Sequence, residues 1–175
     1  MALNLTKAQP ALNLTKSLPN KTKYTVGLAW DQEGDLDTSA VLLKNGLRSD
    51  LVYYQNLTAK GIVHNGDALD GFADGDDETM DIDLSEVDAD EVVVVITSYN
   101  SGSFGANSNP VARLYEKGST KALVEADLAS EAAFGTAVSL VRFFKEGDDW
   151  KFENVSETLG SSSNGLEDVV NKYAA

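Results

Sequence analysis

The sequence contains no cysteine and a single histidine, His64. The absence of cysteine excludes disulfides, thiolate zinc sites and cysteine nucleophiles. One histidine also excludes a metal site that takes several histidines from one chain. No apolar run approaches the roughly 20 residues that span a membrane, and the N-terminus lacks the charged and apolar regions of a signal peptide. We therefore expect a soluble, cytoplasmic protein with no membrane insertion.

Basic residues are also scarce. The 175 residues include 14 Lys plus Arg against 28 Asp plus Glu, which gives a formal net charge of -14. Twelve of these acidic residues lie between positions 61 and 112, where there is no Lys or Arg. A surface of this charge repels nucleic-acid phosphates and anionic lipid headgroups, so we expect no nucleic-acid partner. The concentration of acid in one segment needs a more specific explanation than solubility.

Strand patterns recur along almost the whole chain, and the length suits one domain spanning residues 1–175. The hexapeptide Ala-Leu-Asn-Leu-Thr-Lys occurs at 2–7 and again at 11–16, and its alternation predicts paired edge strands. Further β-branched and aromatic runs predict strands at 24–30, 39–43, 51–54, 79–84, 92–98, 111–115, 121–126, 136–144 and 150–155.

The run at 92–98 is continuous and β-branched, which predicts a central strand buried on both faces. Helical spacing of apolar residues occurs only near the end, at Leu166, Val169, Val170 and Tyr173. We therefore predict an all-β fold, an antiparallel β-sandwich with a short C-terminal helix.

Two acidic clusters adjoin predicted strands, at 31–37 and at 65–78. Carboxylates packed this densely repel one another, and a hard divalent cation removes that repulsion. Calcium takes six to eight oxygen ligands, and glycines such as Gly66, Gly71 and Gly75 let a loop wrap around it. The second cluster is not an EF-hand, because a loop starting at Asp67 has glycine at position 5 and is flanked by strands. A solvated acidic loop is the alternative that the pattern leaves open.

Enzyme signatures are weak. The tripeptide Gly75-Asp76-Asp77 occurs in viral RNA polymerases, but this chain is too short and too acidic for a polymerase. Paired carboxylates serve glycoside hydrolases, which also need a substrate cleft. His64 with Ser39 or Ser98 lacks a nucleophile-elbow motif, so we expect a structural histidine next to a turn. We predict that the protein is not an enzyme.

Several motifs together resemble one family. They are Leu-Asn-Leu-Thr-Lys at 12–16, Val-Gly-Leu-Ala-Trp-Asp at 26–31, Asp-Leu-Asp-Thr-Ser-Ala at 35–40, Val-His-Asn-Gly-Asp at 63–67, Asp-Gly-Asp-Asp-Glu at 74–78, Ser-Phe-Gly at 103–105 and Trp-Lys-Phe at 150–152. In this order, from about residue 2 to 173, they are similar to TerD-type tellurium-resistance and stress-response proteins.

The resemblance implies a non-enzymatic calcium-binding β-sandwich in which two Ca²⁺ ions lie between the acidic loops. It also implies a partner-recognition surface and other stress-response proteins as partners. Carried onto this chain, the metal ligands are Asp31, Asp35, Asp37, Asp67, Asp74, Asp76, Asp77 and Glu78. Ala68 and Ala73 stand where the family usually has asparagine and glycine, which affects the second ion. A Ca²⁺-dependent carbohydrate-binding module and a phage-associated assembly protein are the alternative functions.

Overall fold

Thirteen strands and three short helices make up the computed structural model, which describes residues 11–13, 22–33, 35–66, 70–71, 77–99, 102–106, 108–119 and 121–173. The strands are β1 (Ala11–Asn13), β2 (Lys23–Glu33), β3 (Leu36–Lys44), β4 (Leu47–Val52), β5 (Thr58–Ala59), β6 (Ile62–His64), β7 (Asp70–Gly71), β8 (Glu78–Asp83), β9 (Glu91–Ser98), β10 (Ser108–Glu116), β11 (Ala122–Asp127), β12 (Ala137–Glu146) and β13 (Asp149–Gly160). The helices are η1 (Phe104–Ala106), α2 (Leu128–Glu131) and α3 (Gly165–Lys172).

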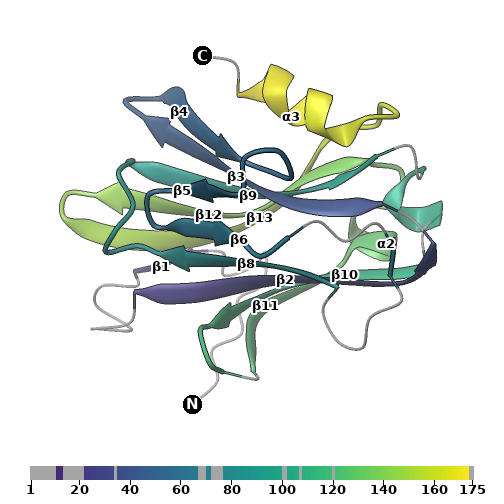
Figure 1. Ribbon diagram of the computed structural model, residues 1–175, viewed down its shortest axis with the longest axis horizontal. Helices are drawn as coiled ribbons and strands as arrows, with labels where there is room; N and C mark the ends of the chain where they lie inside the picture. The colour runs from purple at the N-terminus through teal and green to yellow at the C-terminus, as the bar shows by residue number, and fades with distance from the viewer. Residues whose placement is uncertain are drawn as a thin grey trace.

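The strands form two sheets that pack face to face (Figure 1). The first sheet has the order β1-β13-β12-β9-β3-β4, and the second has the order β11-β10-β2-β8-β6-β5, with β7 paired to β2. Neighbouring strands pair antiparallel, and α3 lies across the outer face of the first sheet. The predicted antiparallel β-sandwich with a short C-terminal helix is thus confirmed. Within the described ranges, no helix is long and apolar enough to cross a membrane.

The main core lies between the two sheets. Its aromatic centre joins Tyr24 of β2 to Phe143 of β12, with 5.4 Å between ring centroids, and Phe143 to Phe152 of β13 at 5.5 Å. Burial of the hydroxyl raises the pKa of Tyr24, and the nearby Glu116 raises it further. This phenol stays neutral in the folded protein.

Strand β9 is buried on both faces, as its sequence predicts. Val92, Val94 and Ile96 face the main core, whereas Val93 and Val95 belong to a second apolar cluster. That cluster also contains Val169 of α3 and Ala137 of β12, with Leu43, Leu51, Leu159 and Tyr173 packed around it. The helix therefore covers a sheet face that would otherwise expose valines to water.

Some boundaries differ from the prediction. The strand predicted at 51–54 instead begins at Leu47, because Asn45 and Gly46, with φ of 54° and 79°, form a tight turn directly after β3. It ends at Val52, since Tyr53 retains only an isolated bridge with Asn56. The prediction was wrong in these bounds, and it missed the short elements β5, β6, β7, η1 and α2.

The second copy of the hexapeptide repeat contributes an edge strand. Residues 11–13 form β1, which pairs with β13 through Ala11 and Glu153, Leu12 and Phe152, and Asn13 and Lys151. The first copy, at 2–7, lies outside the described residues, so the predicted pairing between the copies stays a prediction.

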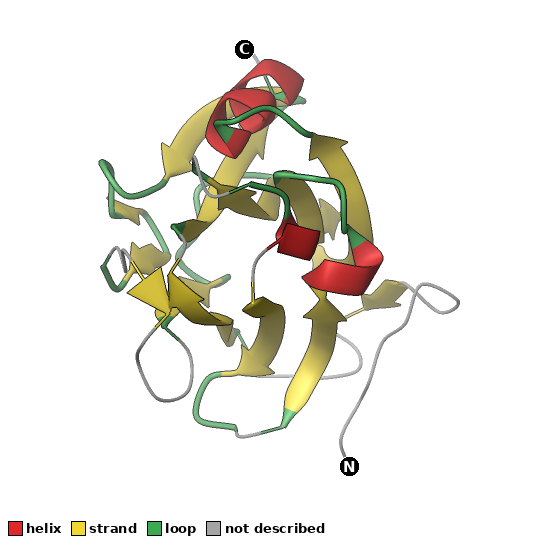
Figure 2. Cartoon of the chain, turned by 90° about the vertical axis from the view of Figure 1, so that its right-hand side faces the viewer, coloured by secondary structure: helices red, strands yellow, loops and turns green. Residues whose placement is uncertain are grey.

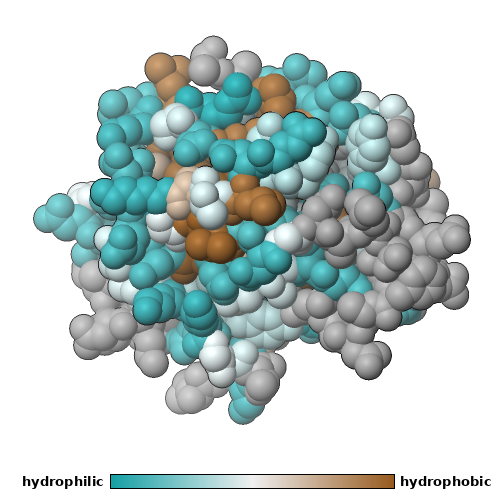
Figure 3. All heavy atoms as spheres, in the orientation of Figure 1, coloured by the Kyte–Doolittle hydropathy of each residue, from teal (hydrophilic) through white to brown (hydrophobic). Residues whose placement is uncertain are grey.

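One end of the sandwich carries the connection between β2 and β3. At this end β2 leads into β3, and η1 and α2 lie close by (Figure 2). The acidic cluster 31–37 therefore lies at this end of the fold. On the side seen in Figure 3 the surface is mostly hydrophilic, with apolar residues gathered in a central area. The exposed apolar side chains Leu47, Tyr54, Leu57 and Val63 come from β4 to β6 and the turns between them.

Candidate functional site

The two acidic clusters, at 31–37 and at 65–78, meet in the fold. The end of β2 pairs with β7, where Gln32 opposes Gly71 and Glu33 opposes Asp70. Two side-chain contacts add to this backbone ladder. The amide of Trp30 donates to Asp77 Oδ2 at 3.0 Å, and the amide of Thr38 donates to Glu78 Oε1 at 2.9 Å.

Thr38 and Glu78 are 40 positions apart in the sequence, yet they are joined by a direct hydrogen bond. On one side, β3 pairs with β9 through Thr38 and as far as Leu36. On the other side, its pairing with β4 ends at Ala40, and beyond that end the Glu78 carboxylate accepts the Thr38 amide. Both acidic segments are therefore fixed to one another by hydrogen bonds.

Asp77, which lies just before β8, makes similar hydrogen bonds with β2. The pairing of β2 with β8 ends at Leu28 and Glu78, and the Asp77 amide still donates to the Leu28 carbonyl at 2.9 Å. Beyond Leu28, the Asp77 carboxylate accepts a hydrogen bond from the backbone amide of Trp30. Each of the two carboxylates thus uses one oxygen to extend a ladder.

His64 is a structural histidine, as the sequence predicts. Its Nε2 lies 2.7 Å from Glu78 Oε1, and both side chains are completely buried. The alternative of a nucleophilic pair with serine is not supported, because the Ser98 hydroxyl donates to the Gly102 carbonyl at 2.7 Å. The His64 imidazole is therefore a hydrogen-bond partner of the buried Glu78 carboxylate.

The predicted ligands of the first cluster line the start of β3 and the end of β2. Asp37 is 6% exposed, Asp35 is half-buried and Asp31 is exposed. The Oδ1 atoms of Asp35 and Asp37 are buried, and no donor to either atom is seen among the residues that the structure describes, although both side chains make other interactions. Buried carboxylate oxygens are costly unless a donor or a cation faces them.

The described residues contain only part of the predicted ligand set. Asp67, Asp74 and Asp76 lie outside them, so their positions stay predictions. Across the part of the chain that the structure describes, no group of three or more His, Asp or Glu is arranged to hold a metal ion. The predicted ligands are all aspartate or glutamate, a chemistry that suits a hard cation such as Ca²⁺ rather than a transition metal.

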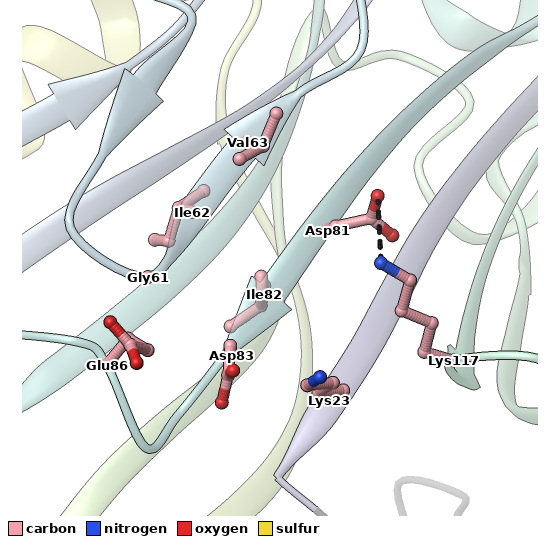
Figure 4. A pocket seen from close by; sticks show the side chains of 9 residues that line it. All are labelled: Lys23, Gly61, Ile62, Val63, Asp81, Ile82, Asp83, Glu86 and Lys117. Atoms are coloured by element: carbon pink, nitrogen blue, oxygen red, sulfur yellow. Dashed lines mark ion pairs between the residues drawn. The ribbon is translucent and has the colours of Figure 1, made fainter.

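A second set of carboxylates lies on the outer face of β8, where Asp81 and Asp83 border a shallow pocket (Figure 4). Asp81 accepts from the Thr25 hydroxyl at 2.6 Å and from Asn65 Nδ2 at 3.1 Å, and Lys117 Nζ lies 3.8 Å from its Oδ2. The alternation of β8 in the sequence already placed these two residues opposite Met80 and Ile82.

Asp83 is held as a carboxylate by its neighbours. Partial burial raises its pKa, but hydrogen bonds from the Ser85 hydroxyl and amide, a contact with Thr22 and the charge of Lys23 outweigh this, so the pKa lies below its usual value. Lysines and hydroxyls thus compensate the negative charge on this face.

The fold and the motifs agree with one known family. The model of the TerD domain matches residues 1–173. The chain belongs to the TerD family. A tellurium resistance protein TerD of Alcaligenes sp is 34% identical over 191 residues, which cover 99% of this chain and 97% of that protein. General stress protein 16U of Bacillus subtilis (strain 168) is 33% identical over 193 residues, with the same coverage of both chains.

A solved structure supports the fold of this TerD family member. The crystal structure of a homologue of telluride resistance protein TerD from Streptomyces coelicolor A3(2) superposes with a TM-score of 0.73 and 19% sequence identity. The match covers 82% of this chain and 93% of that chain. At this identity the likeness shows a shared β-sandwich.

Proposed function

We propose that this TerD protein is a non-enzymatic calcium-binding protein of the tellurite-resistance and stress-response type. In this proposal two Ca²⁺ ions brace the two acidic segments. The observation that carries it is the meeting of these segments through the β2–β7 ladder and through the contacts of Asp77 and Glu78 with the chain around β2 and β3. A solvated acidic loop would not need its carboxylates to be buried, as those of Asp37 and Glu78 are.

Electrostatics favours a cation at this place. Like charges held close together in a partly desolvated site repel strongly, and the segment from 61 to 112 has no Lys or Arg to offset them. A bound divalent ion supplies that positive charge. The proposed ligands are Asp31, Asp35, Asp37, Asp67, Asp74, Asp76, Asp77 and Glu78. The described residues among them do not form a metal-binding group by themselves.

Metal analysis of the purified protein and calorimetric titration with Ca²⁺ test this proposal directly. A ligand that binds only the folded state stabilises it by about 2.7 kcal/mol at a hundredfold excess over Kd. The melting temperature should therefore rise with millimolar Ca²⁺ and fall with chelator. Identical melting curves in Ca²⁺ and in chelator, together with no heat of binding, would refute calcium binding.

Single substitutions test the ligand assignment. Asp37→Ala and Asp76→Ala should each reduce the effect of Ca²⁺ on the melting temperature. Asp83→Ala is a matched control, because it removes one carboxylate from the lysine-compensated face of β8. If Asp83→Ala lowers the calcium response as much as Asp37→Ala does, the ligand assignment is wrong.

We further propose that the calcium-braced end of the sandwich recognises other stress-response proteins in the cytoplasm. The chain has no cysteine, so thiol-based reduction of tellurite by this protein is excluded and its contribution to resistance is indirect. Affinity capture from stressed cells in Ca²⁺ and in chelator tests this. A partner that requires both Ca²⁺ and an intact Asp37 supports the proposal, whereas capture that is unaffected by either contradicts it.

A further inference from the structure

Phe134, in the turn between α2 and β12, is the most exposed large apolar side chain among the residues that the structure describes. Its exposed fraction is 91%, whereas that of Leu47, the next in order, is 60%. The amide of Gly135 closes the turn by donating to the Ala132 carbonyl at 3.0 Å. A phenylalanine that stays in water gains almost no burial energy on folding. Folding stability therefore does not account for this side chain.

The helix η1 holds the turn on both sides of Phe134. The amide of Phe104 donates to the Gly135 carbonyl at 2.9 Å, and the amide of Gly105 donates to the Ala133 carbonyl at 2.9 Å. Phe104 itself is completely buried in the main core. Gly105 lies so close to the turn that a Cβ built there would be 2.7 Å from the Ala133 carbonyl oxygen. Because the backbone is already fixed to the core, a partner that binds Phe134 would order little additional chain.

The turn lies at the end of the sandwich that carries the acidic cluster 31–37, which is called the acidic end below (Figure 2). Two residues after Phe134, the Thr136 carbonyl accepts the amide of Ser98 at 2.8 Å. The next amide, that of Tyr99, donates to the Asp35 carbonyl at 3.0 Å, and the Tyr99 side chain is itself exposed. Backbone hydrogen bonds therefore connect the Phe134 turn to the first acidic cluster.

The chain around the turn carries negative charge. The first residue of β10, which follows η1, is Ser108, and it pairs with the exposed Asp31 of β2. Asp127, the N-cap of α2, is exposed as well. No Lys or Arg occurs in the three segments that contribute to this end, which are 24–43, 61–112 and 122–141. The exposed phenylalanine is thus surrounded by acidic rather than basic segments.

We propose that Phe134 is the anchor through which the acidic end docks on a partner protein, by insertion into an apolar pocket bordered by Lys and Arg. This inference rests on the partner recognition proposed above and gives the chemistry of that partner. A few buried aromatic side chains typically dominate the binding energy of a protein interface. Charge complementarity around such an anchor accelerates association with a basic partner and disfavours an acidic one.

A library of random peptides displayed on phage is the probe. Peptides are selected in chelator on the wild-type protein, after depletion on Phe134→Ser. The enriched peptides should combine large apolar residues with Lys or Arg. As synthetic peptides, they should bind Phe134→Ser with a Kd that is roughly tenfold or more above the wild-type value, and added salt should weaken their binding to the wild type. A selection that yields no such peptide, or that yields peptides rich in Asp and Glu, would overturn the inference.

Leu47→Ser is the matched control, because it also removes an exposed apolar side chain. Strand β3 runs from Leu36 at the acidic end to Lys44, so Leu47, after the following turn, lies at the opposite end. Leu47→Ser should bind the peptides as the wild type does. An equal loss in both variants would show that the peptides bind exposed apolar groups in general, which would overturn the inference.

Two further measurements on Phe134→Ser separate the possible failures. Its melting temperature should match that of the wild type, since the side chain buries almost no surface, so a lost peptide affinity is not a loss of folding. Its calorimetric titration with Ca²⁺ should also match, because Phe134 is not among the proposed ligands. Calcium binding that fails in both proteins refutes the calcium proposal, whereas the peptide selection in chelator tests Phe134 by itself.

Discussion

Strand β8 carries carboxylates in two different settings. Near its start, Asp77 and Glu78 face backbone amides and the imidazole of His64. Further along, Asp81 and Asp83 face the solvent side with Lys117, Lys23 and hydroxyl groups near them (Figure 4). Backbone amides hold a carboxylate in place and leave its charge, whereas lysines offset it. Of the two settings, it is the second that has lysines beside its carboxylates.

The largest expected difference between the settings is in stability. Glu78→Ala removes the hydrogen-bond partner of two buried groups, the Thr38 amide and His64 Nε2. At about 1–3 kcal/mol for each of these two groups, the free energy of unfolding in chelator should fall by about 2–6 kcal/mol. Asp81→Ala should cost less than about 1 kcal/mol, because its partners remain accessible to water.

Urea denaturation in chelator measures both changes. Glu78→Gln is the control, since it keeps an acceptor oxygen while losing the charge, and it should cost less than Glu78→Ala. A smaller loss for Glu78→Ala than for Asp81→Ala would show that the buried hydrogen bonds do not distinguish the two settings.

The next prediction asks whether the two settings are independent. Gly61, between β5 and β6, has φ of +88°, and a Cβ there would lie 2.7 Å from Val87 Cγ2 and 2.8 Å from the Asp83 carbonyl oxygen. Gly61→Ala should therefore destabilise the fold by about 1–3 kcal/mol, measured by thermal unfolding. The increase in melting temperature on adding Ca²⁺ should persist, because Gly61 borders the pocket of Asp83 and not Glu78.

Gly46→Ala provides the comparison for Gly61→Ala. Gly46 also has a positive φ, of +79°, but no atom lies within 4 Å of a Cβ built there. Gly46→Ala should therefore lower the free energy of unfolding by less than Gly61→Ala does. Loss of the calcium response in Gly61→Ala alone would mean that the two ends of β8 are coupled.

A smaller effect is expected for the ion pair on the outer face. A double-mutant cycle of Asp81→Asn and Lys117→Gln should give a coupling energy below about 1 kcal/mol, because Nζ lies 3.8 Å from Oδ2 and the lysine side chain is 55% exposed. The coupling should shrink further at 1 M salt, where the Debye length is about 3 Å. A coupling that is large and unaffected by salt would contradict the view that this face is solvated.

The sequence predicts the sandwich well because its strands are marked locally. The valine run of β9 and the alternation of β8 show which side chains are buried before any pairing is known. The acidic site is less predictable. Its composition is visible, but the meeting of the clusters depends on the two-residue strand β7 and on the contact of Thr38 with Glu78, 40 positions apart.

The role of His64 shows the same limit. Its position next to a turn predicts a structural histidine, yet its tautomer depends on where the Gly66 amide points. That direction is set by the backbone after β6 and has no composition signal. Likewise, the difference between the two ends of β8 cannot be predicted without knowing where Lys23 and Lys117 lie. These lysines come from β2 and from the turn after β10.

The smallest predicted effect concerns the acid titration of the outer face. Because the pKa of Asp83 is lowered in the folded protein, its stabilising contribution is complete above the unfolded value of about 3.9 and is lost as the pH falls through the folded pKa. Ser85→Ala removes the hydroxyl that donates to Asp83 Oδ1 at 2.6 Å, so the pKa of Asp83 should rise toward its ordinary value. Carboxyl carbon-13 NMR titration measures this. The pKa of Asp88, lowered by its hydrogen bond with Lys44, should stay unchanged, and an equal rise at both residues would point to a global change rather than loss of one hydrogen bond.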